Sequence, residues 1–268
     1  MNPTRTGTVT SADGTAIVFD QSGAGPAVIL VQGALMDRHD PVMSGLAAGL
    51  AQWFTVFSYD RRGHGASGDT LPYTVTRETE DLAALITAAG GSAAVFGGSS
   101  GAALALRAAA RNPAISRLAV WEPPYHVDEG APVLPADFAE QLDRLVKAGR
   151  AGDAVERFML EAAQIAPEAV AAMRTQPFWA AMEAGAQTLV YEALVMGPDN
   201  VLPAALLAAV TQPTLVLTGG SSPAWMARAG EAVAREVPGA ALRVLDGQAH
   251  NVAPDAIMPG LREFFAAA

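Results

Sequence analysis

A serine stands at an abrupt change from strand-forming to helix-forming residues. The stretch "AAVFGGSSGAALALRAAA" begins as an apolar, β-favouring run, passes through residues 97–101 and continues at once as an alanine-rich helical pattern. The junction matches G-x-S-x-G, and a tight strand-to-helix turn of this kind strains the serine backbone and projects the hydroxyl above a sheet. The helix N-terminus also places free N–H groups nearby. We predict that Ser99 is a nucleophile; a glycine-rich packing turn, or Ser100 as nucleophile, is the alternative.

A serine hydroxyl needs a base to remove its proton, and the chain has four histidines as candidates. His250 lies in "GQAHNVAP", after the last predicted strand, where a loop side chain can reach the carboxyl ends of the strands. His64 lies in the glycine loop "RRGHG", where we expect a structural role, and His39 and His126 lack the expected order after the serine. The pair Ser99 and His250 predicts attack on an electrophilic carbon; for His250 the alternative is an ordinary surface loop.

Buried strands that alternate with helices must position these side chains. Strand patterns occur at residues 15–20, 27–32, 54–59, 93–96, 118–121 and 214–218 and in "LRVLD", with helical patterns at 76–89, in "AWMARAGEAVAREV" and from Pro254. Little polar alternation in such a strand is typical of burial on both faces. The alternation predicts an α/β fold with a doubly wound, mostly parallel sheet, which binds its ligand at the carboxyl ends of the strands.

One block of the chain has helix patterns only. Residues 127–202 contain amphipathic helices and no strand signal, so we predict a helical cap inserted between the sixth and seventh strands. The core domain then comprises residues 1–126 and 203–268. Trp179 and Met182 of the cap are candidates for the substrate pocket, as are Trp225 and Met226 after the next strand, although such side chains more often pack in a core.

Composition excludes several classes of function. The 268 residues include 17 Lys and Arg against 27 Asp and Glu, and this excess of acids argues against nucleic acid or an anionic membrane as partner. Arg61, Arg62 and His64 form only a small basic patch, and Asp60 is expected to pair with Arg61 or Arg62. Cysteine is absent, which excludes disulfides and thiol nucleophiles. Without a signal-peptide pattern or a membrane-length apolar run, we expect a cytoplasmic monomer or homodimer. No metal or other cofactor is implied, because histidines and carboxylates lack ligand spacing.

Several motifs occur together in an order that is specific. They are "VILVQGA", "YDRRGHGAS", "FGGSSGA", "PTLVLTGG" and "GQAH", and over nearly its full length the chain resembles the α/β-hydrolase family. The resemblance implies Ser99 as nucleophile, His250 as general base and a helical lid. It also implies an oxyanion hole formed by the backbone N–H groups of Ser100 and Ala34. Gln32 stands where the family often has histidine, and this change is expected to alter the pocket.

The acid that orients the base is missing from its usual family position. After the strand before the last, the chain reads "TGGSSPAW", without an acid. Glu122 is the predicted substitute, because a charged residue at the end of a buried strand needs a partner and an imidazole can serve. Some family members place their acid there, and the chain looks like fungal zearalenone lactonases in pairing "SSGA" with "EPP". Asp246, four residues before His250, is the alternative acid.

These features predict a serine hydrolase that cleaves an ester or lactone of a small hydrophobic substrate through a Ser-His-Glu triad and an acyl-enzyme. The same triad can run perhydrolysis or acyl transfer. Dehalogenases and epoxide hydrolases of this fold normally need an aspartate where Ser99 stands. The vacant acid position favours the alternative of a binding protein or sensor with little turnover.

Overall fold

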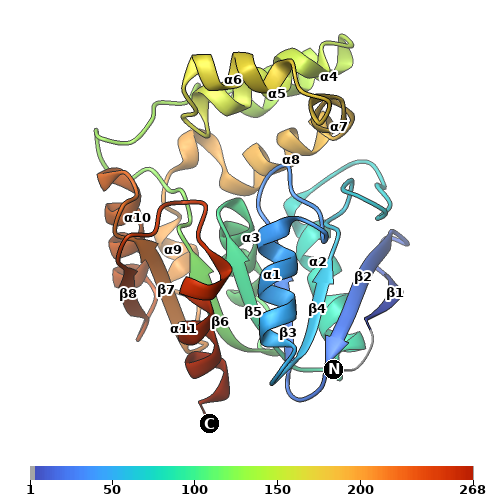
Figure 1. Cartoon of the computed structure of the whole chain (residues 1–268), viewed down its shortest axis with the longest axis vertical. Coiled ribbons are helices and arrows are strands. Elements are labelled where there is room, and N and C mark those ends of the chain that lie inside the picture. The colour runs from blue at the N-terminus through green and yellow to red at the C-terminus, as the bar shows by residue number, and fades with distance from the viewer. Residues whose placement is uncertain (1–3, 268) are drawn as a thin grey trace.

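The computed structural model describes residues 4–267, and within them the chain forms one eight-stranded sheet flanked by helices (Figure 1). In chain order the strands are β1 (Arg5–Thr10), β2 (Ala16–Gly23), β3 (Ala27–Val31), β4 (Thr55–Tyr59), β5 (Ala93–Gly98), β6 (Ile115–Trp121), β7 (Thr214–Gly219) and β8 (Ala241–Leu245). They lie in the order β1-β2-β4-β3-β5-β6-β7-β8. β2 pairs antiparallel with both β1 and β4, and every pairing from β4 across to β8 is parallel. The predicted mostly parallel sheet is confirmed.

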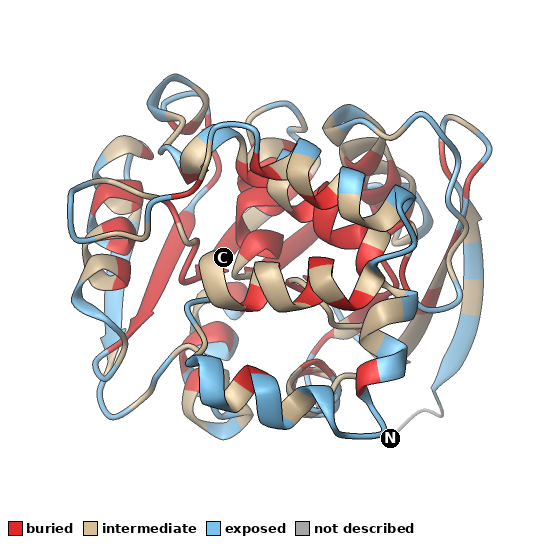
Figure 2. Ribbon diagram, turned by 90° about the horizontal axis from the view of Figure 1, so that it is seen from above, coloured by how far each residue is buried: buried red, intermediate tan, exposed pale blue. Residues whose placement is uncertain are grey.

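Helices cover both faces of this sheet. They are α1 (Pro41–Leu50), α2 (Val75–Ala88), α3 (Ser100–Ala109), α4 (Phe138–Lys147), α5 (Ala151–Glu161), α6 (Pro167–Arg174), α7 (Trp179–Ala184), α8 (Ala186–Met196), α9 (Ala204–Leu207), α10 (Ala224–Glu236) and α11 (Pro254–Ala266). One face packs against α1 and α11, and the other packs against α2, α3 and α10. The central strands are buried, whereas the edge strands β1 and β8 are largely exposed (Figure 2).

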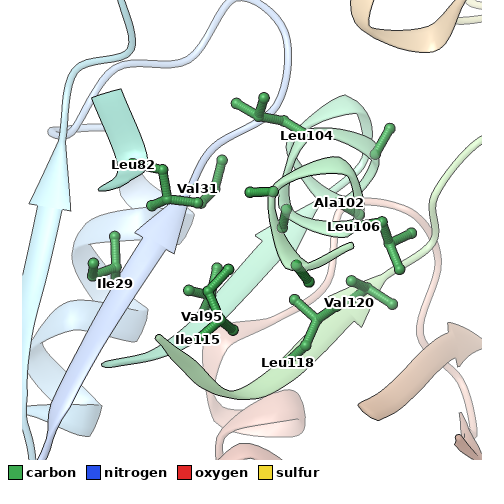
Figure 3. Packing of buried hydrophobic residues seen from close by; sticks show 14 of the residues in the cluster. Ile29, Val31, Leu82, Val95, Ala102, Leu104, Leu106, Ile115, Leu118 and Val120 are labelled. Atoms are coloured by element: carbon green, nitrogen blue, oxygen red, sulfur yellow. The ribbon is translucent and has the colours of Figure 1, made fainter. Parts of the chain in front are cut away.

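The core follows from the alternation of side chains along the central strands. On β3, Ile29 and Val31 enter one buried cluster, and Val28 and Leu30 enter the other. Figure 3 shows the first cluster, in which side chains of β3, β5 and β6 lie against α3. Because successive residues of a strand point to opposite faces, a strand covered on both sides must be apolar throughout. The apolar runs of the sequence are therefore the strands that hold the site in place.

Three elements escaped the sequence patterns: β1, α1 and the four-residue helix α9. β1 reads "RTGTVT" and lies at an edge, so burial required no apolar alternation that could have revealed it. α1 contains two glycines, which lower intrinsic helix propensity. The structure gives the reason for them: a Cβ on Gly45 would lie 2.7 Å from Pro254 Cγ, and one on Gly49 would lie 2.2 Å from Met258 Cε. The glycines thus lower the helix propensity of α1 but allow it to pack closely on α11.

Helices α4 to α8 fall between β6 and β7 in the chain and form a layer above the sheet (Figure 1). We call them the helical layer. α8 lies in contact with α3 beneath it and with α4 and α5 of its own layer. Apolar side chains of the layer form a separate buried cluster, against which Ala34 and Leu35 of the loop after β3 also pack. No helix within residues 4–267 is long and apolar enough to cross a membrane.

Candidate active site

Ser99 occupies a strained turn between β5 and α3. Its backbone has φ 56° and ψ −128°, a conformation that a non-glycine residue adopts only when the surrounding structure enforces it. The Ser99 N–H donates to the carbonyl of Trp121 at 2.9 Å. Ser99 is also the N-cap of α3, where a serine hydroxyl usually accepts from the helix, yet this side chain makes no such bond. The hydroxyl is consequently available for another partner.

Glycines make this turn possible by letting backbones approach. A Cβ on Gly97 would lie 2.5 Å from the carbonyl oxygen of Gly101, and one on Gly101 would lie 2.4 Å from the carbonyl oxygen of Gln32. A Cβ on Gly33 would lie 3.1 Å from that of Ser99. The ends of β3 and β5 and the start of α3 therefore meet with no space for side chains, as the small residues of the motif predict.

His250 connects the serine to an acid. Its Nε2 lies 3.2 Å from Ser99 Oγ, and its Nδ1 lies 2.8 Å from Glu122 Oε2. The histidine sits in the loop after β8, and the Trp121 indole N–H donates to its carbonyl at 2.9 Å. Because an ionised carboxylate can only accept, Nδ1 carries a proton and Nε2 faces the serine as an acceptor. The His250 side chain remains 37% exposed, so water can reach it.

Glu122 is fully buried at the carboxyl end of β6. Its backbone has φ 43°, and its N–H donates to the carbonyl of Leu217 at 3.0 Å. While Oε2 contacts His250, Oε1 accepts from the N–H of Gly219 at 2.7 Å. Gly219 ends β7, where the usual acid position begins, so the segment without an acid supplies the hydrogen bond that orients Glu122.

Asp246, the alternative acid, lies elsewhere. It is exposed, and its carboxylate packs beside Gly220. Within the described chain, no hydrogen bond joins it to His250. Of the two carboxylates considered from the sequence, the structure brings only Glu122 to the histidine.

The two predicted oxyanion donors belong to residues next to the serine turn: Ser100 follows Ser99 in the chain, and Ala34 follows Gly33, which packs against Ser99. The backbone N–H groups of Ser100 and Ala34 donate to no acceptor within residues 4–267. Ser100 begins α3, so its N–H is one of the unpaired donors at a helix N-terminus. Ala34 lies in the loop that Gly33 packs against the serine, and Leu35 follows with φ 60°. A strained loop and a helix start thus leave two donors free beside one hydroxyl.

The predicted pocket residues are scattered. Gln32 is fully buried, with both side-chain amide atoms unpartnered. Trp179 packs inside the helical layer, where its indole N–H donates to Glu183, and Met182 packs against the same cluster. Trp225 lies edge-on to His126 at the start of α10, and the buried Met226 follows it. Core packing accounts for Trp179, as is more common for such side chains.

Two expectations for the loop after β4, a basic patch and the pairing of Asp60 with Arg61 or Arg62, were wrong. Arg61, Arg62 and His64 form no surface patch, because all three are buried. Asp60 pairs with Arg38 instead of either neighbouring arginine. Successive residues of a tight loop point in different directions, so neighbours in sequence need not meet.

Arg61 instead binds two buried glutamates that the sequence patterns did not single out. Its Nε donates to Glu78 of α2 at 2.6 Å, and its Nη1 donates to Glu192 of α8 at 2.7 Å. Burial acts to raise the pKa of Glu192, but the Arg61 charge and the nearby His64 prevail and lower it to about 2. The helical layer is therefore tied to the core by a buried ion pair.

No cluster of three or more histidine, aspartate or glutamate side chains within residues 4–267 is arranged to hold a metal ion.

Comparisons with known proteins identify the family of the chain. The chain is 53% identical to a crystal structure of an alpha/beta hydrolase from Sphaerobacter thermophilus, over 97% of this chain and 100% of that one, with a TM-score of 0.90. It is 27% identical to 2-(acetamidomethylene)succinate hydrolase of Mesorhizobium japonicum, over 91% of this chain and 89% of that protein. A match of 36% identity to the uncharacterized hydrolase YraK of Bacillus subtilis spans only 37% of this chain and 38% of that protein. The model of the alpha/beta hydrolase family matches residues 28–258, and the chain belongs to that family.

Proposed function

We propose that the chain is a serine hydrolase that cleaves a carboxylic ester or lactone bond in a small, neutral, hydrophobic substrate. The observation that carries this proposal is the continuous line of contacts from Ser99 Oγ through His250 to Glu122, at 3.2 and 2.8 Å. Nucleophile, base and orienting acid then have the order and polarity that acyl transfer requires.

In the first half of the reaction, Ser99 Oγ attacks the substrate carbonyl carbon while His250 Nε2 takes the hydroxyl proton. Glu122 stabilises the imidazolium that results. The carbonyl oxygen becomes an oxyanion, which accepts hydrogen bonds from the N–H groups of Ala34 and Ser100. As the tetrahedral intermediate collapses, the bond to the alcohol oxygen breaks and that oxygen takes the proton from Nε2. In a lactone, the released hydroxyl stays attached to the acyl group.

In the second half, water repeats these steps on the acyl-enzyme. His250 Nε2 removes a proton from the water, the resulting hydroxide attacks the ester carbon, and Ser99 leaves with the proton returned to its oxygen. The partial exposure of His250 supports this role, because the imidazole must meet solvent after the alcohol departs.

The pairing of cations with acids in residues 127–202 and in the loops after β3 and β4 favours a neutral substrate. Each cation within residues 127–202 is paired with an acid of the same segment: Arg144 with Asp137, Lys147 with Asp143, Arg150 with Asp153, Arg157 with Glu161, and Arg174 with Asp153 and Glu156. Arg38 and Arg61, in the loops after β3 and β4, are paired as well. These pairs argue against transferring the succinate-type substrate named for the Mesorhizobium relative.

We further propose that residues 127–202 act as a cap over the site and that residues 1–126 and 203–268 form the catalytic core. Packing of the apolar cluster of the helical layer on Ala34 and Leu35 supports this division, because it brings apolar side chains beside the proposed oxyanion hole. Such a surface suits the acyl or alkyl part of a hydrophobic substrate.

Covalent labelling tests the proposal. A fluorophosphonate should form one stoichiometric adduct, and peptide mapping should place it on Ser99. His250→Ala should abolish it, because the hydroxyl loses its base. The labelled enzyme should no longer hydrolyse aryl esters. The unlabelled enzyme should hydrolyse a neutral aryl ester faster than a matched aryl ester that has a carboxylate on its acyl chain. If the folded protein takes no label, the binding-protein interpretation replaces this one.

A further inference from the structure

Arg61 joins three separate parts of the structure next to the site. Its side chain is fully buried and binds Glu78 of the core and Glu192 of the helical layer. The same Nη1 that binds Glu192 also lies 3.2 Å from the backbone carbonyl oxygen of Gln32 and donates to it. One guanidinium therefore reaches the loop after β3 as well as α2 and α8.

The Gln32 carbonyl controls the geometry of the next peptide units. Each peptide is planar, so a fixed carbonyl also fixes the N–H of Gly33. Beyond it, Gly33 would by itself rotate freely, and its rotation would swing the N–H of Ala34. The hydrogen bond from Arg61 and the close contact of Gly33 with Ser99 hold this segment from two sides. The direction of the Ala34 N–H thus depends on where Arg61 lies.

We propose that Arg61 is a positioning residue for the oxyanion hole, which acts by holding the Gln32 carbonyl so that the Ala34 N–H points at the tetrahedral oxyanion. This inference rests on the proposed function, in which Ala34 is one of the two donors. Glu78 and Glu192 hold the guanidinium in place by charge-assisted hydrogen bonds, which restrict its movement more than neutral ones would. A buried arginine that looks purely structural then contributes to the rate.

The chain provides a matched control in the next residue. Arg62 is also fully buried, but its partners are Asp81, Asp13 and the carbonyl of Arg77. None of these lies in the loop after β3 or in the helical layer. Arg61→Lys and Arg62→Lys both keep the charge and lose the planar fork, so a general effect of a buried arginine should appear in both.

The test compares three readouts after folding has been checked by circular dichroism. Arg61→Lys should lower kcat for a neutral aryl ester roughly 10- to 100-fold, since a misplaced reacting group can cost about 100-fold, while KM changes by less than about twofold. The Kd of an aryl trifluoromethyl ketone, which forms a hemiketal with a serine and places its oxyanion in the hole, should rise by a similar factor. Arg62→Lys should leave kcat and this Kd within about twofold. Equal losses in both variants, or a loss in KM alone, would overturn the inference.

Two further variants separate the alternatives. In Glu192→Gln, an amide oxygen can still accept from Arg61 Nη1 and Glu78 still binds Arg61 Nε, so kcat should fall clearly less than in Arg61→Lys. If Glu192→Gln loses as much as Arg61→Lys, the contact with α8 carries the effect and the inference is wrong. If Arg61→Lys fails to fold, the charge-balanced variant Arg61→Gln/Glu192→Gln replaces it. The same changes in kcat, KM and the Kd of the trifluoromethyl ketone are then expected. Fluorophosphonate labelling of the unmodified protein comes first, because a missing Ser99 adduct contradicts the proposed function before any variant is compared.

Discussion

Replacing Glu122 by glutamine is the most specific test of the proposed triad, because the structure fixes how the new amide must lie. The Gly219 N–H donates to Oε1 at 2.7 Å, in a site without solvent exposure. The amide oxygen must stay there, since the opposite orientation would set the amide NH₂ against that N–H. The NH₂ group then faces Nδ1 of His250. Nδ1 becomes an acceptor, and the imidazole proton moves to Nε2, which faces Ser99.

The expected loss follows from this change of tautomer. A histidine with its proton on Nε2 cannot accept from the serine hydroxyl, and its imidazolium would lack a carboxylate. In a serine protease the corresponding change lowers kcat about 10⁴-fold, which corresponds to roughly 5.5 kcal/mol of barrier. We expect a loss of about this size for Glu122→Gln, with little change in KM, because the buried side chain does not line the substrate site.

The assay is steady-state hydrolysis of a neutral aryl ester at pH 7, with fluorophosphonate labelling as a second measure of nucleophile activation. Asp246→Asn is the control, since it makes the same chemical change at an exposed carboxylate. Thermal unfolding of both variants should show that the fold is intact. The reasoning is refuted if Glu122→Gln keeps kcat within tenfold of the original while folded, or if Asp246→Asn is the variant that loses activity.

Three further outcomes are expected. Ser99→Ala should remove all labelling and ester hydrolysis, whereas Ser100→Ala should keep most of kcat because its proposed contribution is a backbone N–H; a large loss in the second variant would contradict that role. Gly101→Ala should lower the free energy of unfolding by about 1–3 kcal/mol in denaturant titration, because the new Cβ would lie 2.4 Å from a carbonyl oxygen. This loss is expected although alanine normally favours a helix over glycine. Gly98→Ala should be tolerated, because no atom lies within 4 Å of the new Cβ. The pKa of Glu192 is lowered from 4.5 to about 2, so the unfolded chain binds the proton more tightly, and stability that is complete above pH 4.5 should be lost as the pH falls toward 2. Urea titrations should show a loss on the order of 3 kcal/mol over this range, and Glu192→Gln should show a smaller pH dependence; an equal dependence in both proteins would assign the acid sensitivity to other groups.

The local chemistry of the sequence predicted the elements that carry the site. A strand that meets a helix through residues 97–101 leaves few backbone solutions, and the structure has the strained serine turn that the glycines require. The buried parallel strands could be predicted from the sequence for a similar reason, because burial on both faces requires an unbroken apolar run. β1 could not be predicted, since an edge strand with exposed residues along it needs no such run.

Which carboxylate meets His250 could be decided only by the tertiary structure. Glu122 and Asp246 both follow predicted strands, and distance along the chain favours Asp246, which is only four residues from His250. Glu122 is 128 residues from the histidine in the chain yet lies 2.8 Å from it. The contact depends on the sheet order, which places β6 beside β7 and the loop after β8 above them. The partners of Arg61 follow the same logic, because α2, α8 and β3 meet there only after the chain has folded. A turn depends on the conformational limits of consecutive residues, so the sequence alone determines it, whereas a contact between distant side chains depends on the packing of the whole sheet.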